Sequence, residues 1–368
     1  MIMATRWIDS HVHVSRYSPD GTDRGDILPP LLEMVEGAGA RLECILSVDL
    51  PEIERMRREP ECVVAANRYI HGLARRAPGQ LFGSCMVNPH FLEASLQAMD
   101  LCFGEWGFVQ LGEMLQYIME FEMDAPAAVT LAKRAVDLNV PMQIHVSTNT
   151  EKGVEHLAGL LALAGKVPEL KIVVAHCLGG AMSDYYLDAL GKRRAEGRAA
   201  NLWVEIRDFN HVPALRRALA EGWEGRLLAG TDWTNRVGPP FLPYGVIFGV
   251  QHAGENPHPP GVPALEGFLR QAGATPEQIE KVAWRNAVGL FGMPWPGACV
   301  PGRFDMPSES DREQGRPARA SSRGSGMTDE LYNQLFDCGC IRFGEFRLRS
   351  GLLSPFYPHR PFSQLVDC

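Results

Sequence analysis

The sequence predicts a (β/α)8 TIM barrel, with a linker and a short C-terminal segment after it. Eight short, β-rich apolar runs recur at fairly even spacing, and stretches of helical periodicity lie between them. Eight such repeats over about 290 residues favour a closed barrel, and a doubly wound open sheet is the weaker alternative. The chain has 368 residues, 45% of them hydrophobic, and can bury a core of this size.

Each element of the barrel is predicted from a local pattern. The predicted strands cover residues 7–14, 42–48, 81–87, 107–112, 140–146, 170–175, 201–206 and 226–230. Helical periodicity is clear at residues 27–38, 125–138, 154–164 and 213–220, and a last helical region at 276–291 closes the ring. Pro126 stands near the first turn of its helix, where a missing backbone N–H costs least.

The chain changes character after the barrel, which is predicted to occupy residues 1–300. Residues 301–326 contain almost no large apolar side chain, so they cannot bury enough surface to become ordered. We expect this stretch to be a flexible linker. Residues 327–368 are apolar in pattern but form a segment too short to fold alone as a typical domain does.

Composition and charge argue against several classes of protein. The formal net charge is −8, which gives no basic field to concentrate a nucleic acid. No apolar run approaches the ~18 residues that span a bilayer, and a polar strand begins too early for a secretory signal. The 9 scattered cysteines are typical of a reduced protein. We therefore expect a cytoplasmic protein that binds a small-molecule substrate, without nucleic-acid or membrane partners; whether it forms a homo-oligomer stays open.

Residues that can bind a metal follow several of the predicted strands. His11 and His13 lie on one face of the first strand, because strand side chains alternate with period two. Four later strands each end in one further ligand-type residue, namely Glu113, His145, His176 and Asp232. Each alone could be a rim residue or a helix cap. Because the C-terminal strand ends of a barrel meet at one mouth, six such side chains together predict a site for one or two divalent ions, with Zn2+ favoured and Mn2+ as the alternative.

These residues, in this order on successive strands, resemble the amidohydrolase superfamily. Trp7-Ile-Asp-Ser-His-Val-His13, Gly230-Thr-Asp-Trp233 and Trp284-Arg-Asn-Ala-Val-Gly-Leu-Phe291 point to the amidohydrolase-related family, also called amidohydrolase 2, over residues ~5–295. The resemblance implies that His11, His13, His145 and Asp232 bind a metal. It also implies that His176 is a ligand of a second metal or a catalytic acid/base.

Glu113 stands where many two-metal members of this superfamily have a carboxylated lysine. No lysine occurs between Gly104 and Asp124, so the resemblance leaves Glu113 as the bridge if two metals bind. The Gly112-Glu113 pair also resembles TatD-type deoxyribonucleases.

A metal-activated water makes hydrolysis the natural reaction of such a site. Asp232 would accept the proton of the water, and His176 would assist the tetrahedral intermediate. Arg207, Arg236 and His90 are candidates for substrate binding, although a solvated or salt-bridged arginine at the rim is the commoner case. His71, His156, His252 and His258 are expected on the surface.

The last part of the chain resembles the N-terminal segment of orotate phosphoribosyltransferases. The matching pattern is Phe343-Gly-Glu-Phe-Arg-Leu-Arg-Ser-Gly-Leu-Leu-Ser-Pro-Phe-Tyr357. The phosphate loop of that family does not follow before Cys368, so this chain alone is not expected to transfer a ribosyl group. The segment is then part of a truncated fusion, or a remnant or read-through.

The sequence is compatible with four functions. The first is a hydrolase acting on a C–N bond of a cyclic amide or related compound, and the C-terminal segment suggests a link to pyrimidine metabolism. The second is a metal-dependent, non-oxidative decarboxylase of an aromatic or unsaturated acid, which the resemblance also implies. A TatD-like nuclease is opposed by the acidic charge. An inactive barrel that serves as a scaffold has no need of six ligand-type residues.

Overall fold

The computed structural model describes residues 6–18, 20–36, 40–148, 150–178, 180–198, 201–207, 212–235, 261–293, 341–347 and 353–358. They belong to two units, residues 1–298 and 299–368, and each unit is considered by itself. The predicted linker at 301–326 and three of the residues singled out above, Arg236, His252 and His258, lie outside the described residues.

The first unit alternates strands and helices along the chain. Its described strands are β1 (Arg6–Val14), β2 (Arg41–Val48), β3 (Leu81–Cys85), β4 (Gln110–Met114), β5 (Met142–His145), β6 (Ile172–Leu178), β7 (Leu202–Ile206), β8 (Leu227–Ala229) and β9 (Trp233–Thr234). The helices up to β6 are α1 (Leu28–Glu36), α2 (Leu50–Met56), α3 (Glu61–Arg76), α4 (Leu92–Gly104), α5 (Gln116–Met119), α6 (Pro126–Asp137) and α7 (Thr150–Lys166). After β6 come α8 (Ser183–Ala195), α9 (Val212–Ala220), α10 (Val262–Gln271), α11 (Pro276–Glu280) and α12 (Asn286–Phe291).

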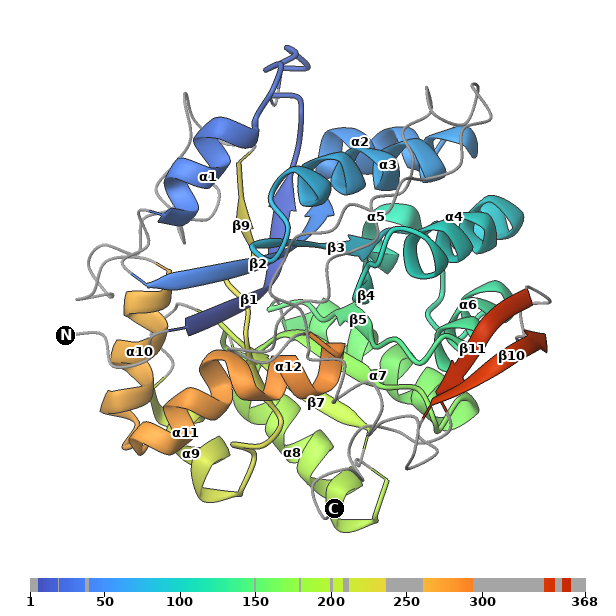
Figure 1. Ribbon diagram of the computed structural model, residues 1–368. Coiled ribbons are helices and arrows are strands. Elements are labelled where there is room, and N and C mark those ends of the chain that lie inside the picture. Colours follow the sequence, from blue (N-terminus) through green and yellow to red (C-terminus); the bar gives the residue numbers. More distant parts are fainter. Residues whose placement is uncertain are drawn as a thin grey trace, which may run out of the picture. The chain divides into compact units, whose positions relative to one another are not determined.

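The strands form one parallel sheet that closes on itself. Its order is β8-β7-β6-β5-β4-β3-β2-β1-β9, and β9 pairs with β1 through Val12 and Trp233. Since β8 and β9 are consecutive in the chain, they are two pieces of one eighth strand that joins β7 to β1. The Ser10 hydroxyl donates to the Ala229 carbonyl at 2.8 Å, and this bond strengthens the closure. The predicted barrel is confirmed, with the helices around its outside (Figure 1).

The eighth strand differs from its prediction. The sequence predicts one continuous strand at 226–230, whereas in the structure the strand is interrupted between Ala229 and Trp233. Asp232 there adopts a left-handed backbone with φ 55°, and its N–H donates to the His11 carbonyl at 2.9 Å. The last predicted helical region, residues 276–291, has the predicted extent. A π-helical turn (η2, Lys281–Arg285) separates it into α11 and α12.

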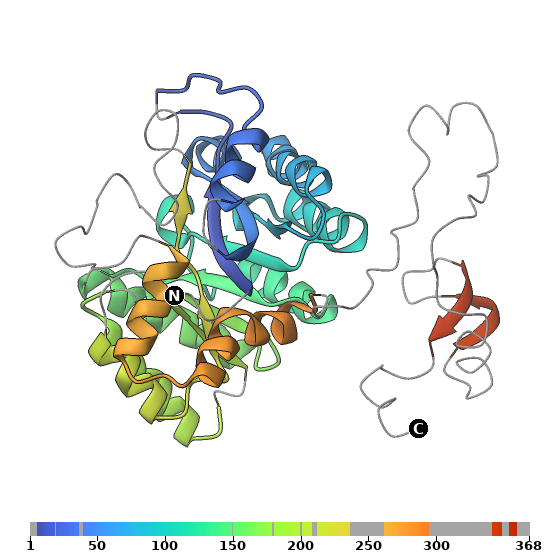
Figure 2. The same cartoon turned by 60° about the vertical axis from the view of Figure 1, so that its left-hand side comes forward.

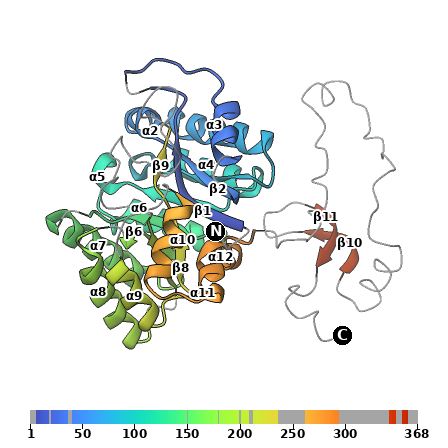
Figure 3. The ribbon, with the colours of Figure 1, turned by 90° about the vertical axis from the view of Figure 1, so that its left-hand side faces the viewer.

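Two layers of apolar side chains hold the barrel together. The larger layer lies between strands and helices, where α3 buries one stripe that includes Val63, Ala66 and Ile70. The smaller layer joins β1, β2, β6 and β8 to α12, and includes Ile8, Ile45, Val173, Leu228, Val288 and Phe291. Seen from another side, α10, α11 and α12 follow one another across the barrel (Figure 3).

The second unit contains one described hairpin. Strands β10 (Ile341–Arg347) and β11 (Leu353–Pro358) pair antiparallel, with Ile341 opposite Pro358 and Arg347 opposite Leu353 (Figure 2). The pattern that resembles the phosphoribosyltransferase segment begins in β10 and ends in β11. None of the described helices is long and apolar enough to cross a membrane.

Glu52 on α2 makes the stability of the barrel depend on pH. Its side chain is 7% exposed, one oxygen accepts from Ser15 Oγ and Arg16 N, and burial raises its pKa from 4.5 to about 7. Between these two values the unfolded chain releases this proton while the folded chain keeps it, so stability falls as pH rises through this window. The Glu52→Gln variant should therefore be more stable than the wild type at pH ~8, by up to roughly 3 kcal/mol, and should lose this pH dependence.

Urea unfolding at pH ~5 and pH ~8 measures this difference. Glu54→Gln, on the exposed side of the same helix, is the matched control and should leave the pH dependence as it is. An equal stability difference between wild type and Glu52→Gln at both pH values would contradict the prediction.

Candidate metal centre

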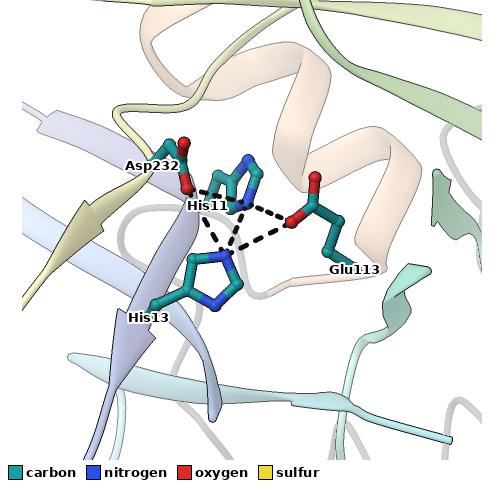
Figure 4. Close-up of side chains that lie close together, drawn as sticks. All are labelled: His11, His13, Glu113 and Asp232. Atoms are coloured by element: carbon teal, nitrogen blue, oxygen red, sulfur yellow. Dashed lines mark hydrogen bonds and ion pairs between the residues drawn. The ribbon is translucent and has the colours of Figure 1, made fainter. Parts of the chain in front are cut away.

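Four side chains gather at the C-terminal ends of the strands (Figure 4). His11 and His13 come from β1, Glu113 from β4, and Asp232 from the break between β8 and β9. The two Nε2 atoms lie 3.0 Å apart. Glu113 Oε2 lies 3.3 and 3.4 Å from them, and Asp232 Oδ1 lies 3.4 Å from each. The set is buried, with Asp232 the most exposed member at 13%.

A second set shares Glu113. Its other oxygen, Oε1, lies 3.0 Å from His145 Nδ1 and 2.9 Å from His176 Nε2. The structure thus brings all six sequence-predicted ligands together, but in two groups. His145, which the resemblance places with His11, His13 and Asp232, lies in the second group, and Glu113 takes its place in the first.

The first group has the donors and spacing for a divalent cation. His11 Nδ1 faces Glu205 Oε2 at 2.8 Å and His13 Nδ1 faces the Val48 carbonyl at 3.0 Å. If both Nδ1 atoms carry the proton, both Nε2 lone pairs point toward each other, and a shared cation removes their repulsion. Donors bonded tetrahedrally at about 2.1 Å are about 3.4 Å apart, close to the observed separations. Two imidazoles and two carboxylates suit Zn2+ and also Mn2+.

The charges of the site also favour a cation. Burial raises the pKa of Glu113, but His11 and His176 outweigh it, and the pKa falls well below its usual value. The pKa of Asp232 is likewise lowered, since His176 and Arg207 outweigh burial. Burial lowers the pKa of His11, but Glu205, Glu113 and Asp232 raise it well above 6.5. Three ionised carboxylates around these imidazoles therefore attract positive charge, either a proton on His11 or a metal.

Glu205 holds the His11 ring through its Nδ1 atom, and the sequence analysis did not single it out. This carboxylate of β7 is fully buried and accepts from four groups: His11 Nδ1, His176 N, Gln143 Nε2 and Ser10 Oγ. Such contacts fix the tautomer and the orientation of a metal-binding histidine. The available signal was a single carboxylate in the apolar strand Leu-Trp-Val-Glu-Ile.

Backbone strain marks the same strand ends. His176 and Asp232 have φ values of 59° and 55°, in a region that costs a non-glycine residue about 1–3 kcal/mol. Such strain clusters at functional sites. Gly112, just before Glu113, has a φ of 115°, and a Cβ there would lie 2.4 Å from the Gln143 carbonyl oxygen, so only glycine fits.

Gly230 lets the chain pass directly over Glu205. A Cβ at this position would lie 2.2 Å from Glu205 Oε1, and the four donors around that carboxylate prevent it from moving aside. Gly230→Ala should therefore lower the free energy of unfolding by about 1–3 kcal/mol, measured by urea unfolding. Gly225→Ala, which meets nothing within 4 Å, is the control and should change stability by less than about 0.5 kcal/mol. Equal stabilities of the two variants would contradict this account.

A cavity of about 700 Å3 opens in front of both groups. His13, Glu113, His176 and Asp232 line its inner end, and apolar side chains such as Ile118 and Phe121 line other walls. This size suits a small organic substrate. The Tyr117 ring, 51% exposed, stands beside the His145 ring with their centroids 4.6 Å apart.

The predicted substrate-binding residues have different surroundings. Arg207 lines the cavity, but its Nη2 lies 3.1 Å from Asp232 Oδ2, so it already holds a carboxylate of the site. His90 is exposed and does not line the cavity; its Nε2 lies within hydrogen-bond distance of the Met119 and Glu120 carbonyls. Arg236 lies outside the described residues.

The prediction that His156 lies on the surface is wrong. His156 is 5% exposed and lines the cavity, 5.4 Å from the His145 ring between centroids. It belongs to the buried stripe of α7 with Gly153, Leu157 and Leu160, whose helical spacing was the overlooked signal. Burial lowers its pKa to about 4, so its imidazole is neutral near pH 7.

A (β/α)8 barrel with histidine and carboxylate donors gathered at its strand ends is the arrangement of barrel enzymes that bind divalent metals. The family model described as Amidohydrolase matches residues 8–293, and the chain belongs to this family. No curated protein matches the chain.

Solved structures with the same fold include two decarboxylases and a hydratase. A dihydroxybenzoic acid decarboxylase from a Polaromonas species, with bound manganese and 2-nitroresorcinol, is 17% identical with a TM-score of 0.58, covering 80% of this chain and 98% of that one. The structure of 5-carboxyvanillate decarboxylase from Sphingomonas paucimobilis is 13% identical with a TM-score of 0.55, and the match covers 79% of this chain and 100% of that one. The structure of 4-oxalomesaconate hydratase from Rhodopseudomonas palustris is 16% identical with a TM-score of 0.55, and the match covers 78% of this chain and 96% of that one. At these identities the likeness is one of fold.

Proposed function

We propose that this protein is a hydrolase that holds two divalent cations, bridged by Glu113, and cleaves a C–N or related bond of a small molecule such as a cyclic amide or lactone. The observation that carries the proposal is the division of one carboxylate between two groups of donors. Glu113 Oε2 faces His11 and His13, and Glu113 Oε1 faces His145 and His176.

This division argues for two cations rather than one. A single cation at His11, His13 and Asp232 would use one oxygen of Glu113 and leave the other hydrogen-bonded to two histidines. The second oxygen and its two imidazole neighbours, from His145 and His176, offer three ligand atoms within 4.8 Å of one another, and these residues would hold the second cation.

Bound divalent cations would make hydroxide available near pH 7 and polarise a carbonyl group. The side chains of this protein would orient the reactants and move protons. Asp232 is ionised and partly open to the cavity, and Arg207 holds its Oδ2 at 3.1 Å, so it can accept a proton from water and deliver it to the leaving group. His176 Nδ1 is buried, lies 3.6 Å from the same oxygen and has no hydrogen-bond partner among the described residues, and we assign His176 to assist the tetrahedral intermediate.

The test combines metal content with a substrate screen. Full-length protein purified without chelators should contain two divalent ions per chain by elemental analysis, and should hydrolyse members of a panel of cyclic amides, lactones and phosphodiesters. Hydrolysis that stops on chelation and returns with Zn2+ or Mn2+ supports the proposal. One ion per chain and no hydrolysis would overturn it.

A second candidate is non-oxidative decarboxylation of an aromatic or unsaturated acid. It is favoured by the structural neighbours, several of which are described as decarboxylases of aromatic acids. With one cation at the first group, His176 would be free for acid/base work. Carbon dioxide release from dihydroxybenzoates by a one-metal protein would establish this function in place of hydrolysis. A role in pyrimidine metabolism stays a prediction.

A further inference from the structure

A second, smaller cavity lies behind the wall of the first. Its volume is about 240 Å3, and its lining includes Arg16, Glu52, Arg55, Ala65, Ala66 and Tyr69. At about 30 Å3 for each water-sized group, it has room for roughly eight non-hydrogen atoms.

Helix α2 separates the two cavities. Leu50 and Ile53 line the larger cavity, whereas Glu52 and Arg55 line the smaller one. Each pair is three residues apart and so shares a side of the helix, and the two pairs point in different directions. A molecule in the smaller cavity would therefore contact the helix that forms one wall of the larger cavity.

Two residues that line the smaller cavity each carry a buried polar atom without a hydrogen-bond partner among the described residues. One is Glu52 Oε2, on a side chain that is 7% exposed, and the other is the Tyr69 hydroxyl oxygen. The remaining oxygen of Glu52 accepts from Ser15 Oγ at 3.0 Å and from Arg16 N at 3.1 Å, which fixes the carboxyl group. A buried polar atom without a partner costs about 1–3 kcal/mol, so a ligand that donates to both atoms would recover that energy.

The two arginines that line this cavity, Arg16 and Arg55, differ in whether another residue already binds their guanidinium groups. Arg16 is held by both oxygens of Asp23, at 2.8 and 2.6 Å. Arg55 is exposed and forms no ion pair with another described residue. The cavity thus combines an inner carboxyl and phenol with an outer guanidinium group that can bind a carboxylate.

We propose that this cavity binds a small zwitterion, such as a short amino acid, with its ammonium group between Glu52 and Tyr69 and its carboxylate at Arg55. Ala65 and Ala66 leave room for a short aliphatic portion. Burial keeps the pKa of Glu52 near 7, so the ammonium group should bind more tightly as pH rises above that value.

The site is connected to the candidate metal centre through the chain that follows β1. Ser15, which donates to Glu52, lies two residues after His13, and its backbone exchanges two hydrogen bonds with Asn235, three residues after Asp232. Occupancy of the smaller cavity would stabilise this segment and α2 together, which makes it a candidate effector site.

Isothermal titration calorimetry of the metal-loaded full chain at pH ~8 tests the proposal with glycine and β-alanine as probes. Methylamine and acetate, which each carry one half of the zwitterion, should bind more weakly. Glu52→Gln and Arg55→Gln should each weaken binding about tenfold or more, and Tyr69→Phe should weaken it less. Glu54→Gln, on the same helix, is the matched control and should bind as the wild type does.

Two results would overturn the proposal. In the first, neither zwitterion binds the wild type at millimolar concentration, which would mean that water alone fills the cavity. In the second, binding survives unchanged in Glu52→Gln and in Tyr69→Phe, which would place the probe elsewhere, for example on the metals. Thermal melts of the variants confirm that each is folded, and Tyr69→Phe, which removes one hydroxyl, tests the same cavity independently of Glu52→Gln.

Discussion

Replacing Glu113 with Gln should reduce the bound divalent metal from two ions per chain to one or fewer, and should lower hydrolysis by at least about 10²-fold. The amide keeps the shape of the side chain, but its nitrogen cannot bind a cation, so one of the two donor groups loses its ligand. The loss should fall on either the group of His11 and His13 or that of His145 and His176. Elemental analysis of both proteins after identical purification measures the change.

Glu122→Gln is the matched control for this experiment. Glu122 lines the same cavity but is exposed and belongs to neither donor group, so its variant should keep two ions. An unchanged stoichiometry of two in Glu113→Gln would show that Glu113 is not a bridge. One ion in wild type and variant alike would favour the decarboxylase.

Replacing Glu205 with Ala should weaken metal binding about 10- to 100-fold and destabilise the metal-free protein by at least about 3 kcal/mol. The change leaves four donors, among them His11 Nδ1 and Gln143 Nε2, without their acceptor in the barrel interior. It also frees the His11 ring to rotate or change tautomer, so that Nε2 is no longer held toward the site. Competition with a chelator gives the metal affinity, and urea unfolding without metal gives the stability.

Glu205→Gln separates these two effects. The amide keeps one acceptor oxygen and the volume of the side chain, so the stability loss should be smaller than in the alanine variant. Its metal affinity should still fall, because a neutral amide supports the His11 imidazole less strongly than a carboxylate does. Wild-type metal affinity in both variants would show that Glu205 has no part in holding the metal centre.

The sequence by itself determined the barrel and the six candidate ligands. Strand and helix periods are local properties, and the strands lie close to their predicted positions, from Trp7–Val14 to the start of the eighth strand. The ligand candidates followed because period two puts His11 and His13 on one face, and because all strand ends of a barrel meet at one mouth.

Only the tertiary structure decided how those residues are grouped. Glu113 lies about a hundred positions from His11 in the chain, so no local pattern shows that it contacts both histidine pairs. For the same reason the sequence could not show Glu205 behind His11, or Arg207 bound to Asp232. The break in the eighth strand depends on His11 as well, since its carbonyl accepts from Asp232 N. Ligand types are properties of the chain, whereas the distances between them depend on how the strands close into a ring.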